Sequence, residues 1–352
     1  MYCPRLKHFV RLNRDGLIGK CGHMKSAPGF VNFQQLDDSK WLQKVTEEMA
    51  KDQWPKECVR CQQTEEVSGE SIRTKSITRH KMLHPIKEDY LVVGGVLDNI
   101  CNSACQTCNS GLSTKIGSLE SRNYPRVDNF DKFWQLPQSR ILEVDVNGGE
   151  PTASKNYKKI LKNLPENTKI VRMNTNGSRM IPELEDILRK RIMVIVTLSF
   201  DGVGKTHDYV RWPIKWKNYI KSVRAYKNLQ KQFNLLKLNL WTTVSSLNVA
   251  NLPSILDFAA EHNLDHDWAF LNKPEALDVK FTNTYTTRAK EKLKNSTYKL
   301  CRELSKKIAI DKNNQQQIDL FIKKQDYIRK IKITDYFNFI EKCSKNISAK
   351  RL

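Results

Sequence analysis

The sequence lacks several features that would place it in common protein classes. No apolar run approaches the roughly 20 residues that a membrane-spanning helix needs. The first residues, MYCPRLKHFVRLNRDG, have neither the apolar core nor the cleavage site of a secretory signal. No glycine fingerprint for a dinucleotide and no solenoid-type repeat is present. We therefore expect a cytoplasmic protein without a membrane partner.

Acidic residues are the scarcer charged class. Sixty Lys and Arg face 38 Asp and Glu, which gives a formal net charge of +22 in 352 residues. Residues 272–352 contribute 20 basic and 9 acidic residues, or half of that net charge. This balance suits a polyanionic partner such as nucleic acid, but Lys-rich helix faces that only meet water explain it equally well.

Nine cysteines in a chain without an export signal favour metal or cluster ligation over disulfides. They form an early group, a tight central group and two isolated positions. The positions are Cys3, Cys21, Cys58 and Cys61, then Cys101, Cys105 and Cys108, then Cys301 and Cys343.

The chain divides by pattern into three regions, 1–79, 80–271 and 272–352. Residues 1–79 hold little apolar sequence and one clear helix near 39–49, so their four cysteines could staple a small module. Residues 272–352 predict helices at 318–333 and 336–343, with a polar loop at 313–317 and no strand.

The middle region alternates strands with helices, which predicts an α/β protein with a parallel sheet. The expected strands are 90–97, 141–146, 170–173, 193–200, 236–244 and 268–271. The expected helices are 157–164, 181–190, 216–233 and 252–262. Six units predict an open (β/α)6 barrel, with its chemistry at the C-terminal ends of the strands.

The strongest motif is Cys101-x3-Cys105-x2-Cys108, directly after the first of these strands. Three thiolates in one loop can hold a 4Fe–4S cluster and leave one iron open to a substrate or cofactor. The alternatives are three unrelated buried cysteines, or a zinc site that lacks one ligand.

Polar loops follow the later strands, and in a barrel all of them would meet at one mouth. They are Asn147-Gly148-Gly149-Glu150-Pro151, Asn174-Thr175-Asn176-Gly177, Ser199-Phe200-Asp201-Gly202 and the segment that ends at Arg211.

On these motifs, residues 90–271 resemble the radical S-adenosylmethionine (SAM) superfamily. The resemblance implies a partial (β/α)6 radical SAM barrel, with the 4Fe–4S cluster on Cys101, Cys105 and Cys108 and SAM on its open iron. It implies cofactor contacts from Gly148, Gly149, Glu150, Asn174, Asn176, Ser199, Asp201 and Arg211. One departure is Thr107, where the family usually has an aromatic residue before its third cysteine.

The same resemblance implies the chemistry, that of an oxidoreductase- or transferase-type enzyme. A reduced cluster cleaves SAM to methionine and a 5′-deoxyadenosyl radical, and this radical takes a hydrogen atom from the substrate. An electron donor such as flavodoxin or ferredoxin is implied as a partner.

Residues 1–75 resemble the auxiliary-cluster module of the SPASM/twitch subgroup, here placed before the barrel as in some phage and environmental members. The resemblance rests on Cys3-Pro4, Lys20-Cys21, Trp54-Pro55-x2-Cys58-x2-Cys61, Glu65-Glu66 and Gly69-Glu70-Ser71-x-Arg73. It implies an auxiliary 4Fe–4S cluster on Cys3, Cys21, Cys58 and Cys61. Zinc is the alternative metal, and His23 is an alternative ligand if Cys3 is not one.

Three functions remain open. The first is radical modification of a peptide or protein, which the SPASM/twitch resemblance implies. The second is radical modification of a nucleotide, tRNA or DNA, supported by the charge and by Trp212, Trp216, Tyr219 and Trp241, which could stack on bases. The third is a non-enzymatic zinc or iron–sulfur module that binds nucleic acid. Cys301 and Cys343 are expected to be buried small side chains, or else thiols that donate a hydrogen atom to a substrate radical.

Overall fold

The computed structural model describes residues 1–121 and 124–337. It is a mixed α/β fold whose main sheet has eight strands in the order β2-β1-β3-β4-β5-β6-β7-β8. β2 pairs antiparallel with β1, whereas β1 with β3, β3 with β4, β4 with β5, and β7 with β8 are parallel. The α/β class with a mostly parallel sheet is therefore confirmed. The sheet is open in the described part of the chain, with β2 and β8 as its edges.

The chain forms two compact units. Unit 1 comprises residues 1–100, 125–173 and 181–195, and unit 2 comprises 101–124, 174–180 and 196–352. This division does not follow the three sequence regions, whose boundaries stay a prediction. Within the described residues, no helix is both long and apolar enough to cross a membrane.

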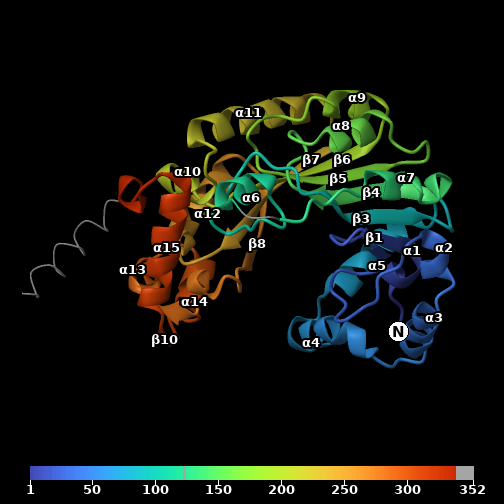
Figure 1. Cartoon of the computed structure of the whole chain (residues 1–352), viewed down its shortest axis with the longest axis horizontal. Helices are drawn as coiled ribbons and strands as arrows, with labels where there is room; N and C mark the ends of the chain where they lie inside the picture. The colour runs from blue at the N-terminus through green and yellow to red at the C-terminus, as the bar shows by residue number, and fades with distance from the viewer. Residues whose placement is uncertain (122–123, 338–352) are drawn as a thin grey trace, which may run out of the picture. The chain divides into compact units, whose positions relative to one another are not determined.

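Unit 1 carries the first strands of the sheet and the helices of the cysteine-rich region, which Figure 1 shows in blue. Its strands are β1 (Phe9–Leu12), β2 (Ile18–Gly19), β3 (Leu91–Asp98), β4 (Ile141–Gly148) and the larger part of β5 (Ile170–Thr175). Its helices are α1 (Pro4–His8), α2 (Phe33–Asp37), α3 (Lys40–Ala50), α4 (Val59–Ser68), α5 (Ile72–Leu83), α7 (Phe130–Trp134), α8 (Lys155–Lys162) and α9 (Leu184–Arg189).

Unit 2 carries the later strands and the C-terminal helices, drawn from orange to red in Figure 1. Besides the second part of β6 (Met193–Ser199), its strands are β7 (Leu236–Val244), β8 (Asp265–Phe270), β9 (Phe281–Thr282) and β10 (Asp311–Asn313). Its helices are α6 (Thr114–Glu120), α10 (Lys205–Val210), α11 (Trp216–Gln232), α12 (Leu252–Glu261), α13 (Thr284–Lys294), α14 (Lys299–Ser305) and α15 (Gln315–Arg329).

The six strands expected from the sequence are all present, and each strand end lies within three residues of its expected position. No strand was identified from the sequence in the front region, whereas the structure has β1 there, which extends the sheet beside β3. Phe9 of β1 lies so close to Gly94 of β3 that an added Cβ there would come within 2.4 Å of its ring. β1 has only four residues, so its apolar pattern was too short to identify.

The C-terminal region was predicted to hold no strand. β9 and β10 form a two-stranded parallel sheet there, and β10 occupies part of the expected polar loop. The helix at 318–333 exists as α15 but begins at Gln315 and ends at Arg329. Most of the helix expected at 336–343, including Cys343, lies outside the described residues.

Two glycines end β4 because its backbone passes directly against the end of β3. The Gly149 N–H donates to the Asp98 carbonyl (2.9 Å), and the Glu150 N–H donates to the Ile100 carbonyl (2.7 Å). A Cβ on Gly149 would lie 1.9 Å from the Ile100 oxygen, and one on Gly148 would lie 2.1 Å from the Asp98 oxygen. The glycines are thus required by the chain's own packing, whatever else they contact.

Gly149→Ala is expected to lower the free energy of unfolding by about 3 kcal/mol or more, since backbone atoms on both strands must move. The melting temperature should fall by about 4 °C or more for a protein of this size. Gly19→Ala is the control, because Gly19 is outside the left-handed region and a Cβ there would come no closer than 3.3 Å, to the side chain of Asn13. Equal melting temperatures for the two variants would contradict this packing argument.

Candidate active site

The cysteine loop lies wholly in unit 2, between the end of β3 and α6. Its backbone runs beside the segment after α10, where the Ala104 N–H donates to the Trp212 carbonyl and the Gln106 N–H to the Val210 carbonyl, both at 2.8 Å. On its other side, Thr114 at the start of α6 bonds to the backbone of Cys101. Cys105 is buried, whereas Cys101 and Cys108 are partly exposed. The loop is therefore held by hydrogen bonds to its backbone. Among its thiols, the Cys101 Sγ accepts from the Ser103 N–H (3.4 Å) and the Cys108 thiol donates to the Asn109 carbonyl (3.7 Å).

The thiols interact electrostatically with one another and with nearby arginines. Burial, followed by the neighbouring Cys105 thiol, raises the pKa of Cys108 to about 12. Burial also raises the pKa of Cys105, while the positive charges of Arg211 and Arg329 act to lower it. Thiolates are unfavourable in such a site without a cation, and a bound metal or cluster removes this cost.

Asp201 and Arg211 form a buried ion pair beside this loop. The Arg211 Nη1 donates to the Asp201 Oδ2 at 2.9 Å, and the other carboxylate oxygen accepts from the Thr243 N–H of β7 at 2.8 Å. Asp201 is 1% exposed. The carboxylate therefore fixes the guanidinium in one orientation.

This ion pair leaves one donor of Arg211 unused. Its Nε is buried and has no hydrogen-bond partner. Both ring nitrogens of His207 and the hydroxyl of Tyr219 nearby are likewise buried without a partner. The His207 and Tyr219 rings lie 4.5 Å apart, and Tyr219 also covers Gly177. Buried polar atoms without partners are rare, so this group points to a polar ligand. His207 and Tyr219 were not predicted from the sequence as residues of the cofactor site. The signal that could have identified His207 is its position one helical turn before Arg211.

The other unit 2 residues predicted to bind the cofactor differ in their surroundings. The Asn176 side chain donates to Asn102 (2.7 Å) and to Ser103 (2.8 Å), so it holds the cysteine loop. Asn174 is exposed near the end of β5, and Ser199 is partly exposed at the end of β6. Their contacts with a cofactor stay predictions.

Gly148, Gly149 and Glu150 lie in unit 1. Glu150 is buried, and its carboxylate accepts from the hydroxyl (2.8 Å) and the N–H (3.1 Å) of Thr152 in its own turn. The role predicted for these three residues toward a cofactor likewise stays a prediction.

The four early cysteines line one cavity in unit 1, together with His23 and Arg73. The four positions come from the start of α1, the loop after β2, and the start of α4. Burial, and then the neighbouring cysteine thiols, raise the pKa of Cys58 to about 12. Burial and the adjacent arginines lower the pKa of His23 to about 4, so this imidazole is neutral near pH 7.

The acidic and basic residues of the front motif have a structural function. Arg73 forms an ion pair with Glu65, and Ser71 caps α5 through the N–H groups of Arg73 and Thr74. The Arg73 Nη1 also donates to the Tyr2 carbonyl (2.9 Å), beside Cys3. This network joins α4, α5 and the start of the chain around the cysteine cavity.

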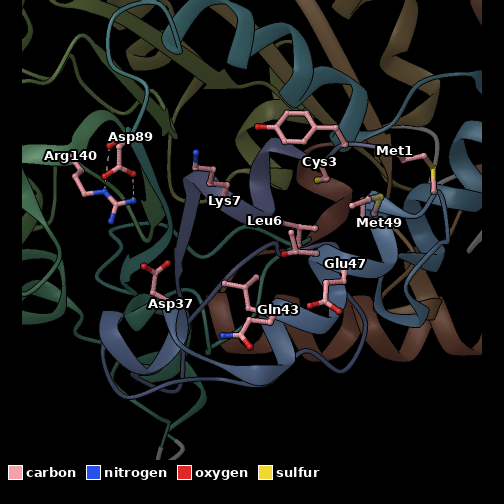
Figure 2. A pocket seen from close by; sticks show the side chains of 14 residues that line it. Met1, Cys3, Leu6, Lys7, Asp37, Gln43, Glu47, Met49, Asp89 and Arg140 are labelled. Atoms are coloured by element: carbon pink, nitrogen blue, oxygen red, sulfur yellow. Dashed lines mark hydrogen bonds and ion pairs between the residues drawn. The ribbon is translucent and has the colours of Figure 1, made fainter.

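A larger pocket of about 610 Å³ adjoins this cavity, with Cys3, Leu6 and Met49 in the walls of both. Figure 2 shows α1 and α3 residues around it, with the Asp89–Arg140 ion pair at one side. Its charged lining side chains are Lys7, Asp37, Glu47, Asp89 and Arg140. The N-terminal ammonium of Met1, which pairs with Asp52, also belongs to a lining residue.

Of the four aromatic residues that could stack on bases, Tyr219 is buried, whereas Trp212 and Trp216 are partly exposed. Trp216 and Tyr219 pack against Phe200, with ring centroids 5.9 Å and 5.6 Å away. Trp241 on β7 is exposed by 39%. Cys301 is fully buried in α14, as expected for a small apolar side chain.

The residues of both cysteine groups fit iron–sulfur clusters by their chemistry. Thiols are the usual ligands of such clusters, and the unused Arg211 donor suits the carboxylate of a bound cofactor. Across residues 1–121 and 124–337, no group of three or more His, Cys, Asp or Glu side chains is spaced to hold a single metal ion.

Comparison with known proteins assigns the central part of the chain to a family. Residues 96–242 match the model of the Radical SAM superfamily. The mycofactocin maturase MftC of Mycolicibacterium smegmatis is 28% identical over 164 residues, which are 46% of this chain and 40% of the maturase. The pre-heme d1 synthase of Dinoroseobacter shibae is 26% identical over 127 residues, 36% of this chain and 30% of the synthase.

Among solved structures, the chain is similar to native anSMEcpe with bound AdoMet, at 16% identity and a TM-score of 0.39. That match covers 58% of this chain and 59% of the other. It is also similar to Streptococcus suis SuiB bound to S-adenosylmethionine, at 13% identity and a TM-score of 0.41, over 92% of this chain and 69% of the other. At these TM-scores we transfer no function. The chain spans less than half the length of the curated relatives it matches. The comparisons thus support a radical SAM superfamily domain at residues 96–242.

Proposed function

We propose that the protein is a radical SAM enzyme that modifies a peptide or protein. The observation that carries the chemistry is the buried Asp201–Arg211 pair with its unused Nε donor, within electrostatic reach of the buried thiol of Cys105. When bound, a reduced 4Fe–4S cluster and SAM supply the one-electron cleavage that yields methionine and a 5′-deoxyadenosyl radical.

The residues of unit 2 have distinct roles in this proposal. Cys101, Cys105 and Cys108 ligate the cluster, and three thiols leave one iron for SAM. Arg211 binds the SAM carboxylate, with Asp201 holding the guanidinium in place. Asn176 keeps the cysteine loop in position through Asn102 and Ser103. On the family resemblance, the proposal adds contacts to SAM from Ser199, Asn174 and the Gly148-Gly149-Glu150 segment.

A peptide is favoured over a nucleic acid because of the pocket beside Cys3. Asp89 is ion-paired with Arg140, which leaves Asp37 and Glu47 as the acidic lining side chains outside that pair, and carboxylates repel a phosphate backbone. A pocket of this size with an apolar wall of Leu6, Leu42 and Met49 suits amino-acid side chains. The net charge of +22 is the observation that favours tRNA or DNA as the second candidate.

The test is 5′-deoxyadenosine formation by the anaerobically reconstituted chain with SAM and dithionite. We expect 5′-deoxyadenosine and methionine in equal amounts, and neither without the reductant. A reconstituted chain that holds iron but forms no 5′-deoxyadenosine would contradict the proposed chemistry. For the substrate class, tRNA affinity that falls steeply between 50 and 200 mM salt would favour the second candidate.

The four early cysteines are proposed to hold an auxiliary cluster. The Cys58→Ala/Cys61→Ala double variant should therefore lose about four of about eight irons per chain and still cleave SAM. Iron and acid-labile sulfide quantification measures the loss. Zinc in the wild-type chain, with about four irons, would instead make the front site a zinc site.

A further inference from the structure

The cysteine loop has a second support, which comes from far along the chain. Arg329 is the last residue of α15, and its Nε donates to the Ala104 carbonyl at 2.8 Å. Its Nη2 lies 3.4 Å from the Cys105 carbonyl, on the same loop. One guanidinium thus bonds the backbone between the first two cysteines of the motif.

Arg329 is itself held firmly. It is 5% exposed, and its Nη1 donates to the side chain of Gln325, one turn earlier in α15. The same helix is fixed at Asp326, which accepts from the Tyr209 hydroxyl (2.8 Å) and from the Ile333 N–H (2.7 Å). Ile318 and Ile322 of α15 pack in one apolar cluster with Tyr209 and Val210. A rigid helix therefore presents the guanidinium to the loop.

The loop needs such a donor. The N–H groups of Ala104 and Gln106 already bond to Trp212 and Val210, and the Cys105 carbonyl also accepts from the Cys108 N–H at 3.2 Å. The Ala104 carbonyl is therefore the loop acceptor that depends most on Arg329. Buried carbonyls without a partner are costly, and a charged donor satisfies them more strongly than a neutral one. The N–H groups of the loop thus bond to residues 210–212, and its carbonyls bond to Arg329.

We propose that Arg329 is a positioning residue, through which α15 holds the cysteine loop in the form that accepts the cluster. The inference rests on the proposed function for the cluster, but the clamp on the loop does not depend on metal. It also assigns the basic C-terminal region a role inside the protein. Because the guanidinium is positively charged, it additionally stabilises the reduced, more negative cluster.

Three variants separate the contribution of the Arg329 charge from that of its hydrogen-bond geometry. Arg329→Met keeps the apolar stem and removes the charge and donors, while Arg329→Lys keeps the charge and removes the two-donor geometry. Arg302→Met is the matched control. Arg302 lies on α14 in the same region, and its Nη1 also donates to two backbone carbonyls, those of Ser296 and Thr297 (both 2.7 Å), away from the cysteine loop.

The first readout is amide hydrogen–deuterium exchange of the cysteine loop in the metal-free, reduced chain, followed by mass spectrometry at fixed pH. Loss of the charged hydrogen bonds should make the bonded amides of Ala104 and Gln106 exchange about 10- to 100-fold faster in Arg329→Met, with a smaller increase in Arg329→Lys. Arg302→Met should exchange like the wild type. Equal rates for Arg329→Met and wild type would overturn the clamp.

The second readout is iron content and the reduction potential of the cluster after anaerobic reconstitution. We expect Arg329→Met to hold less iron than Arg302→Met, and its remaining cluster to have a more negative potential than the wild type. Full iron with an unchanged potential would refute the role toward the cluster. No iron in the wild type would refute the proposed function instead, while hydrogen exchange of the loop would still decide whether Arg329 clamps it. Circular dichroism checks that each variant is folded.

Discussion

The Cys101→Ala/Cys105→Ala/Cys108→Ala variant is expected to lose all 5′-deoxyadenosine formation and about four irons per chain. The thiols of Cys105 and Cys101 are close enough to Cys108 to raise its pKa, and the loop is shaped by the backbone bonds of Ala104 and Gln106. Removing the sulfur atoms therefore removes ligands and the Ser103 N–H bond to Cys101, and leaves those backbone bonds in place.

The control for this variant is Cys301→Ala. Cys301 is a fully buried thiol in the same unit, and we place it outside the site. It should keep the wild-type iron content and activity, at a stability cost of about 1 kcal/mol. If the triple variant kept its iron, or if Cys301→Ala lost it, the assignment of the central cysteines would be wrong.

Arg211→Met is expected to weaken SAM binding about 100-fold while iron content stays unchanged. The variant loses a charge-assisted hydrogen bond to a carboxylate, and such bonds to charged groups contribute about 1.5–3 kcal/mol. Isothermal titration or equilibrium dialysis of SAM on the reconstituted enzyme measures the effect. Arg211→Lys should restore little, since an ammonium cannot bond Asp201 and a second carboxylate in the same fixed plane.

Losing Arg211 also leaves Asp201 as a buried carboxylate without its ion-pair partner, which destabilises the fold. Arg172→Met is the control for this effect. Arg172 pairs at 2.6 Å with the buried Glu143, in unit 1, and Arg79 also pairs with Glu143 at 3.4 Å. This variant therefore weakens a buried ion pair rather than leaving the carboxylate alone. Arg172→Met should lower the free energy of unfolding without weakening SAM binding. A dissociation constant for Arg211→Met within about threefold of the wild type would contradict the role of Arg211.

The sequence was sufficient to predict features that rest on local pattern. The parallel strands from 91 onward have strong apolar runs, and the cysteine motif places its three thiols in one loop by spacing alone. The pair Asp201 and Arg211, predicted separately as cofactor contacts, is bonded in the structure.

Features that depend on contacts between distant residues were not predictable in the same way. β1 is too short to show a pattern and is defined by its register with β3, Phe9 opposite Val92. Arg329 meets Ala104 across 225 positions, and nothing in the basic C-terminal sequence distinguishes it from neighbouring surface lysines. Gly148 and Gly149 were predicted as cofactor contacts, but nothing in the sequence indicated that their nearest neighbours are backbone atoms of residues 98–100.

Electron paramagnetic resonance of the dithionite-reduced Cys58→Ala/Cys61→Ala chain, with and without SAM, tests the central claim most directly. That variant retains only the cluster proposed for Cys101, Cys105 and Cys108. We predict a 4Fe–4S signal whose g-values change when SAM is added, because SAM binds the iron that lacks a thiolate. A cluster signal identical with and without SAM, or no cluster in a folded chain, would contradict the account.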